Sequence, residues 1–297
     1  MGESIEQTKS RLQVFGWLDQ KLSLAPWVEW KDLVAGVPTS VGILPIASSR
    51  GIWNPRQLNY TLSIMNTKKG IYEDQRLSEE VFEYAYQGSS GVEGNNTKLR
   101  AAYLDKAPFV LLEQIEVGRF IPHYPVFAIA DDPIRRVFTI SLSDSFPVSP
   151  VDQINLEIDK SYKQQMTRQR IHQPRFRARV LLAYRESCAI CQLKHIELLD
   201  AAHIIPDSAE GGSASVSNGL SLCKIHHAAY DRNVMGISPD YRVKVRPDLL
   251  EEIDGPMLKN GIQAMENVRI LTPARSELKP DKDSLDVRYQ EFLSKAN

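Results

Sequence analysis

The chain contains three cysteines, and all of them stand at a spacing that suits metal binding. Cys188 and Cys191 form a Cys-x-x-Cys pair, and Cys223 and His226 repeat that spacing later in the chain. Two such pairs place four soft ligands on two tight turns, which is the full complement of a closed tetrahedral zinc site. Three buried thiols in a reduced interior would be the alternative, but that role requires no particular spacing. The pattern therefore predicts a structural Zn²⁺ held by these four residues.

A second set of candidate ligands follows in the same stretch. His227 and Asp231 are four residues apart in a segment, 226–232, that is expected to be helical, so both side chains face the same way. An imidazole and a carboxylate suit a hard or borderline divalent cation such as Mg²⁺ or Mn²⁺. His203 lies in a short apolar run that ends at Pro206 and is expected to be an exposed imidazole on a strand. Two metals are therefore expected, one that holds the fold together and one that polarises a phosphate.

The order of these residues resembles the HNH, or ββα-metal, nucleases, particularly the zinc-stabilised branch found in modification-dependent restriction enzymes. The resemblance implies that His203 is the general base that activates a water and that Asn218 orients its ring. It also implies that His227 and Asp231 bind the catalytic divalent ion, which would stabilise the charge that develops on the phosphate. His203, Asn218 and His227 are thus the expected catalytic residues.

Two positions depart from the commonest form of that motif. The residue before the general base is often His or Asp and is Ala202 here. Asp200, two residues earlier and therefore on the same face of a strand, is the candidate replacement ligand for the catalytic ion. An acidic residue that merely ends the preceding loop is the alternative. The last metal position is often His and is Asp231 here. Because Ala202 cannot bind a metal, a DNA-binding protein with a decayed catalytic site is also an alternative.

Positive charge is concentrated just before the zinc ligands. Between Ser161 and Arg185 there are seven Lys or Arg residues and no acid, although the whole chain has a net charge of −1. The near-neutral total argues against charge-driven coating of DNA, whereas the local cluster favours phosphate contacts over a merely solvated helix face. The expected contacts are Arg168, Arg170, Arg175, Arg177 and Arg179. Double-stranded DNA is the expected partner, and a membrane is not, because no apolar run is long enough to span one.

Length and composition allow two domains in an ordinary globular protein. The chain has 297 residues, of which 42% are hydrophobic and 25% charged. Apolar residues at helical spacing, including Leu12 and Leu18, indicate a helix before Pro26, and several later runs alternate as strands do. The expected class is α+β, with an N-terminal β-rich barrel and a C-terminal nuclease domain stabilised by zinc. The expected parts are a helical segment over 1–36, a reader domain over 37–148, a basic linker helix over 149–174, the HNH domain over 175–250 and a helical tail over 251–297.

The β-rich part resembles an SRA domain, a PUA-like barrel that flips a modified cytosine out of duplex DNA. The resemblance is carried by four phrases: Gly70-Ile-Tyr72-Glu-Asp74, Tyr84-Ala-Tyr86-Gln-Gly88, Asn95-Asn96-Thr97 and Pro108-Phe-Val110. It implies that Tyr72 and Tyr86 stack on the flipped base and that Asp74 accepts a hydrogen bond from its amine. The family usually has its key acid one residue later, where this chain has Gln75, so the preferred modification stays open. Core packing is the alternative role for both tyrosines.

The expected function is a bacterial restriction endonuclease that recognises 5-methyl- or 5-hydroxymethylcytosine by base flipping and hydrolyses nearby phosphodiester bonds. A cytoplasmic location is expected, because the cysteines must stay reduced for zinc and the N-terminus lacks a basic-then-apolar leader. Two alternatives to the recognition of modified cytosine are that the N-terminal domain reads another DNA mark, such as a phosphorothioate backbone, and that it binds a ligand. The sequence leaves the oligomeric state open, and a homodimer is one possibility, because double-strand cleavage by one nuclease site per chain would use two copies.

Overall fold

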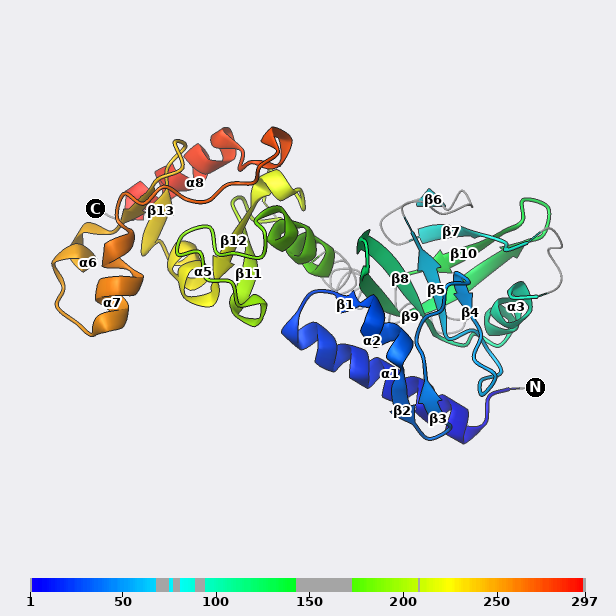
Figure 1. Cartoon of the computed structure of the whole chain (residues 1–297). Helices are drawn as coiled ribbons and strands as arrows, with labels where there is room; N and C mark the ends of the chain where they lie inside the picture. The colour runs from blue at the N-terminus through cyan, green and yellow to red at the C-terminus, as the bar shows by residue number, and fades with distance from the viewer. Residues whose placement is uncertain are drawn as a thin grey trace, which may run out of the picture. The chain divides into compact units, whose positions relative to one another are not determined.

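The computed structural model describes residues 2–67, 75–76, 81–88, 94–142, 173–207 and 209–295. The chain forms two compact units that divide between His172 and Gln173, and both are drawn in Figure 1. Every helix in these ranges is too short or too polar to traverse a lipid bilayer. Each unit has its own arrangement of helices and strands, as expected for an α+β protein.

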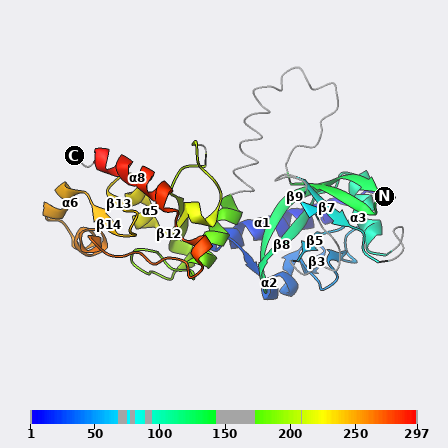
Figure 2. The ribbon, with the colours of Figure 1, turned by 90° about the horizontal axis from the view of Figure 1, so that it is seen from above.

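The first unit is built on one mixed sheet that curls into a half-barrel (Figures 1 and 2). β5 and β8 are parallel, and the other paired neighbours are antiparallel. The order is β4 (Ile52–Trp53), β5 (Ser63–Asn66), β8 (Phe109–Glu116), β9 (Arg119–Asp132), β10 (Val137–Ser141), β7 (Val81–Ala85) and β6 (Gln75–Arg76), with β1 (Val28–Glu29) paired to β9. The α+β class is confirmed, and an SRA or PUA-like identity for this half-barrel stays a prediction.

Strand β8 shows why the sheet needs cover on both faces. Phe109 and Leu111 belong to one buried cluster, and Val110 and Leu112 belong to a second. Because side chains alternate along a strand, an unbroken apolar run means that both faces are buried. The cover comes from α1 (Ile5–Leu24), α2 (Trp30–Ala35), α3 (Asn96–Leu104) and the hairpin of β2 (Val37–Thr39) and β3 (Gly42–Leu44).

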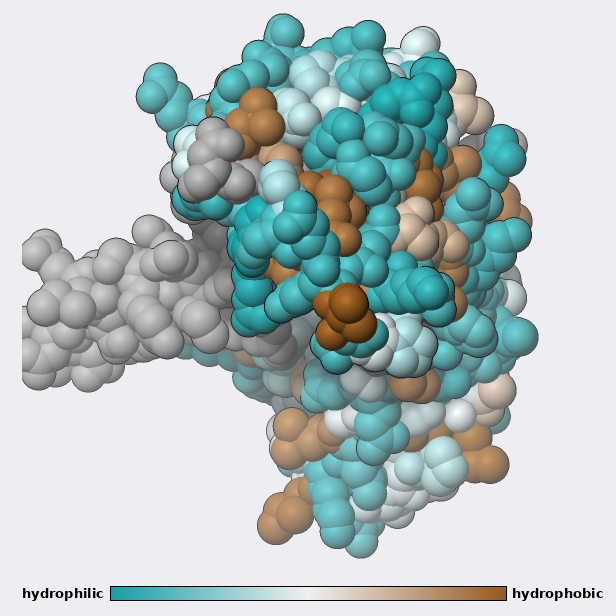
Figure 3. Space-filling model, turned by 90° about the vertical axis from the view of Figure 1, so that its left-hand side faces the viewer, coloured by the Kyte–Doolittle hydropathy of each residue, from teal (hydrophilic) through white to brown (hydrophobic). Residues whose placement is uncertain are grey.

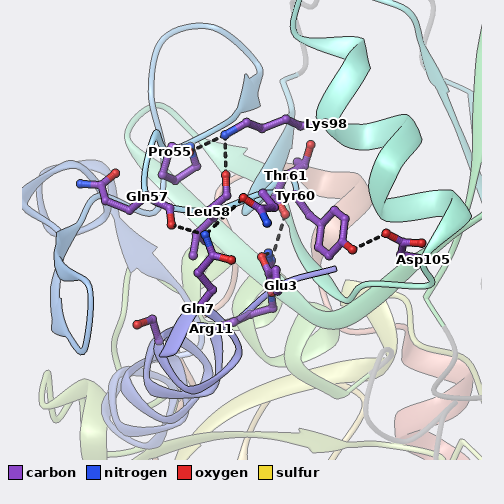
Figure 4. Close-up of polar contacts among 12 residues, drawn as sticks. Glu3, Gln7, Arg11, Pro55, Gln57, Leu58, Tyr60, Thr61, Lys98 and Asp105 are labelled. Atoms are coloured by element: carbon purple, nitrogen blue, oxygen red, sulfur yellow. Dashed lines mark hydrogen bonds and ion pairs between the residues drawn. The ribbon is translucent and has the colours of Figure 1, made fainter. Parts of the chain in front are cut away.

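Helix α1 is fixed by charge as well as by apolar packing. It buries Val14 and Leu18, whereas Leu12, one of the apolar residues that predicted the helix, is 61% exposed. On its inner side Arg11 is 1% exposed, pairs with Glu3 and donates to the Thr61 carbonyl over 2.9 Å (Figure 4). A buried guanidinium needs such partners, because an unpaired charge in the interior is strongly destabilising.

The second unit contains the ββα arrangement that carries the predicted ligands. β11 and β12 form an antiparallel hairpin in which His203 pairs with Gly219, and α5 follows directly from β12 and packs against both strands (Figure 1). A helix over residues 173–183 precedes it. The elements are β11 (Leu199–His203), β12 (Gly219–Cys223), α5 (Lys224–Asp231), β13 (Met235–Ile237), β14 (Val243–Val245), α6 (Pro247–Glu251), α7 (Pro256–Gly261) and α8 (Lys282–Lys295).

The C-terminal helices cover the ββα arrangement and expose a mainly polar surface. α8 packs on β13, where Gly236 leaves room for the Phe292 ring, because a Cβ there would lie 2.6 Å from it. Arg288 of α8 donates to the Tyr230 carbonyl at the end of α5 over 2.6 Å. On the face shown in Figure 3, apolar residues form small groups among hydrophilic ones. Such scattered apolar residues are normal on a water-facing surface.

Candidate active site and metal centre

The three cysteines and His226 meet in one cluster. Their ligand atoms all lie within 4.8 Å of one another. The Nδ1 atom of His226 is 3.4 Å from Cys188 Sγ and 3.3 Å from Cys223 Sγ, and the sulfurs of Cys191 and Cys223 are 4.0 Å apart. In a tetrahedral zinc site, the usual bond lengths imply about 3.8 Å between sulfurs and about 3.6 Å between sulfur and nitrogen. The four residues therefore fit a closed Zn²⁺ site in chemistry and in size.

Local backbone geometry prepares these ligands. Cys188 accepts from the Gln192 amide and donates to the Leu193 carbonyl, each over 2.9 Å, so the first pair sits on a closed turn. Cys223 is the N-cap of α5, which places His226 one turn into the helix. The Nε2 atom of His226 lies 2.8 Å from the Gly261 carbonyl, so this nitrogen carries the proton and Nδ1 is left to bind a cation.

The electrostatics of the cluster also favour a bound cation. Hydrogen bonds from the Cys191 and Cys223 thiols lower the pKa of the Cys188 thiol. Burial by itself would lower the pKa of His226, but hydrogen bonds to the Cys188 and Cys223 sulfurs outweigh it and raise that pKa to about 10. Without a metal, a proton on His226 therefore balances thiolate charge. Zn²⁺ would replace that proton and supply the same balance.

His203 lies at the end of β11 with its ring stacked on Phe176. The ring centroids are 3.9 Å apart and the planes differ by 11°. Burial lowers the pKa of His203, so the imidazole is neutral over a wider pH range, as a general base must be. Sequence reasoning missed Phe176, although it lies in the predicted basic segment with Val180 one helical turn later. That apolar spacing was the available signal for a buried helix face.

Asn218 is bonded to the backbone on the C-terminal side of His203. Its Oδ1 accepts from the Ile205 amide over 2.9 Å, and its Nδ2 donates to the carbonyls of Ile205 and Ser213 over 2.8 and 2.9 Å. The side chain therefore holds the backbone that follows His203, because the loop after β11 folds back over Asn218. A direct contact between Asn218 and the imidazole stays a prediction.

His227 lies between two carboxylates. Its Nδ1 atom is 3.8 Å from Asp200 Oδ2, and its Nε2 atom is 3.3 Å from Asp231 Oδ2. The nearby Asp200 carboxylate is the main cause that raises the pKa of His227, and the imidazole in turn lowers the pKa of Asp200. The set also influences His203, whose pKa the His227 charge lowers and the Asp231 charge raises. Two imidazoles and two carboxylates thus gather at the junction of β11 and α5.

The predicted phosphate contacts differ in their surroundings. Arg168 and Arg170 lie outside the described residues, and Arg175 and Arg179 lie on the helix over 173–183, where Arg179 is exposed and Arg175 partly buried. Arg177 makes contacts within the protein, and its contact with a phosphate stays a prediction. Its guanidinium donates to the Leu199 carbonyl over 2.8 Å and lies 3.3 Å from Asp200, so it is directed at the strand instead of at solvent.

The described part of the base pocket favours core packing. Tyr72 and Asp74 lie outside the described residues. Tyr86 is 3% exposed, packs on Phe138 with ring centroids 4.7 Å apart, and engages Asp131 and Arg100 through its hydroxyl. These are the contacts expected of a core tyrosine. Stacking of Tyr86 on a flipped base stays a prediction.

Comparison with known proteins identifies the ββα region. Residues 188–238 match the family described as HNH endonuclease, so the chain contains an HNH endonuclease domain. No curated protein matches the chain. A solved structure titled "Modification dependent TagI restriction endonuclease" is 13% identical, with 78% of this chain and 82% of that chain covered and a TM-score of 0.31.

Proposed function

Proceeding from the HNH domain, we propose that the protein is a metal-dependent DNA endonuclease whose specificity comes from its N-terminal unit. The observation that carries this proposal is the grouping of His203, His227 and Asp231 where β11 meets α5, directly beside the cysteine cluster. The cluster can hold a zinc ion that stabilises the fold, because its donor set and spacings suit one. The remaining imidazole and carboxylate groups stay free for hydrolysis.

The proposed reaction is hydrolysis of a phosphodiester bond. His203, kept neutral by its partly buried position, takes a proton from a water whose oxygen bonds to phosphorus. The bond from phosphorus to the 3′ oxygen breaks, and that oxygen takes up a proton from solvent. His227 and Asp231 would hold Mg²⁺ or Mn²⁺, and a bound divalent ion stabilises the negative charge that develops on the phosphate. Phe176 keeps the His203 ring in one orientation by stacking on it.

Specificity in this proposal comes from a modified base. With a net charge of −1, the protein has little general attraction for DNA, so a base-specific contact must select the site. The SRA-like phrases of the first unit support 5-methyl- or 5-hydroxymethylcytosine as that base. The burial of Tyr86 favours a second candidate, in which the first unit reads another DNA mark, such as a phosphorothioate backbone, or a ligand.

Digestion of matched plasmids tests both candidates. The plasmids carry cytosine, 5-methylcytosine, 5-hydroxymethylcytosine or phosphorothioate links, and each is incubated with Mg²⁺ and with Mn²⁺. We expect cleavage only of a modified plasmid, and expect His203→Ala to abolish it while DNA binding and the fold survive. His195→Ala is the matched control, because His195 is 67% exposed and pairs only locally with Glu197 among the contacts described. Cleavage by His203→Ala at the wild-type rate would refute the proposed base.

A further inference from the structure

Asp200 is surrounded by positive charge and donors on both of its oxygens. Its Oδ1 atom lies 3.3 Å from Arg177 Nε, and its Oδ2 atom lies 3.8 Å from both Lys224 Nζ and His227 Nδ1. The carboxylate is 31% exposed, so these pairs are only partly screened by water. A divalent ion on Asp200 would have to lie beside two cationic side chains. The surroundings therefore suit a carboxylate that orients a neighbour more than one that binds a metal.

His227 offers one nitrogen to each of two carboxylates. Nδ1 faces Asp200 and Nε2 faces Asp231, which lies one helical turn later and is 58% exposed. A neutral imidazole carries one proton, so only one of its nitrogens has a free lone pair. With the proton on Nδ1 directed at Asp200, the Nε2 lone pair faces Asp231 and solvent. A cation can then reach Nε2 and the Asp231 carboxylate together.

Arg177 fixes the other side of Asp200. Its Nη2 atom donates to the carbonyls of Leu199 and Ile196, over 2.8 and 3.5 Å, so the guanidinium is tied to the backbone immediately before Asp200. The side chain is 21% exposed. Its Nε atom faces Asp200 as an ion pair without a hydrogen bond between them, while the fork of the guanidinium stays on the two carbonyls. The helix over 173–183 therefore sets the position of the Asp200 carboxylate.

We propose that Arg177 and Asp200 are positioning residues that hold the proton of His227 on Nδ1 and direct its Nε2 lone pair at the catalytic cation. This inference deepens the proposed function and rests on its divalent cation. It gives Asp200 the role of the carboxylate in a carboxylate–histidine–metal arrangement, in place of the predicted role as a ligand. It gives Arg177 a role inside the protein in place of the predicted phosphate contact.

The first test needs neither metal in the active site nor DNA. Long-range ¹H–¹⁵N spectra of the zinc-loaded full chain, at a pH where the ring is neutral, report which nitrogen of His227 is protonated. We expect the Nδ1–H form in the wild type and a shift toward Nε2–H in Asp200→Asn, because the amide no longer favours a proton on the facing nitrogen. Arg177→Lys should show an intermediate population. Asp248→Asn, an exposed acid paired with Arg246 in the same unit, is the matched control and should leave the spectrum unchanged.

The second test measures Mn²⁺ binding by the loss of the free-ion electron paramagnetic resonance signal. Removal of an orienting carboxylate typically weakens metal binding about 10- to 100-fold, so we expect that change for Asp200→Asn and a larger loss for Asp231→Asn. An Nε2–H ring in the wild type, or the same ring form in Asp200→Asn, would overturn the inference. The inference would also be overturned if Asp200→Asn abolished Mn²⁺ binding while Asp231→Asn retained it, because Asp200 would then be a metal ligand. If the wild type binds Mn²⁺ and its ring form depends on Asp200 but it cuts no DNA, the proposed function fails and this inference stands.

Discussion

The close packing at Gly219 predicts that a larger residue there lowers both the stability and the activity of the protein. This prediction depends on the tertiary structure alone. The residue begins β12 opposite His203, and its φ of −129° is one that alanine adopts freely, so the backbone tolerates Gly219→Ala. The added Cβ, however, would lie 2.5 Å from Val180 Cγ2 and 2.9 Å from Phe176 Cζ. Both neighbours belong to the helix over 173–183, and Phe176 is the ring on which His203 stacks. The substitution must therefore displace that helix face or the ring.

The size of the effect follows from these contacts. Overpacking a buried site typically costs about 1–3 kcal/mol, and two contacts below 3.0 Å place this change in the upper half of that range. The second unit spans Gln173–Asn297, and for a domain of that size each kcal/mol lowers Tm by roughly 3–6 °C. We also expect cleavage to fall by about 100-fold if His203 moves by about 1 Å. The loss of activity should exceed the fraction of protein that is unfolded.

The assay compares four proteins by thermal and urea unfolding and by plasmid cleavage: wild type, Gly219→Ala, Val180→Ala and the double variant. Val180→Ala removes the nearest clashing atom. The double variant should therefore lose about 0.5–3 kcal/mol less free energy of unfolding than the sum of the losses in the two single variants. Gly255→Ala is the matched control, because a Cβ there meets nothing within 4 Å. Wild-type stability in Gly219→Ala, or strict additivity in the double variant, would refute the packing inferred around His203.

Four further predictions concern the metals, the pH dependence and the DNA contacts. Cys191→Ser removes one of four clustered ligands and should release zinc and unfold the second unit, because zinc-binding energy is folding energy there; zinc content and circular dichroism measure this. The pKa of His203 is lowered by burial, so at saturating Mg²⁺ the acid limb of kcat/KM should lie below the ordinary value of about 6.5. The nearby Asp200 raises the pKa of His227, so at limiting Mg²⁺ protons compete with the cation for this imidazole. The acid limb of kcat/KM should therefore move to higher pH as Mg²⁺ is lowered. An acid limb that does not change with Mg²⁺ concentration would contradict this. Arg179→Ala should weaken the binding of modified and unmodified DNA alike and reduce the salt dependence of binding by about one ion. A change in the preference for modified over unmodified DNA would instead indicate that Arg179 contacts a base.

Spacing along the chain determined the parts of the site that local geometry controls. Each of the pairs Cys188–Cys191 and Cys223–His226 brings its own two ligand atoms together because the pair lies on a single turn or helix start, whereas the two pairs meet through a tertiary contact in which the Ala189 amide donates to the Ser221 carbonyl. His227 and Asp231 meet at 3.3 Å because residues four apart share a helix face. The α+β class followed in the same way from alternating and helical apolar periods. These are short-range consequences of backbone geometry.

Only the tertiary structure decided which way the other side chains point. Arg177 belongs to a basic run, yet it faces Asp200 because the helix packs on β11. Tyr86 matches a base-stacking phrase, yet Phe138 from another strand covers its ring. Phe176 reaches His203 because Gly219, far along the chain, leaves the space. The physical reason is common to all three: a period in the sequence defines the faces of an element, but the partner that covers a face comes from elsewhere in the chain.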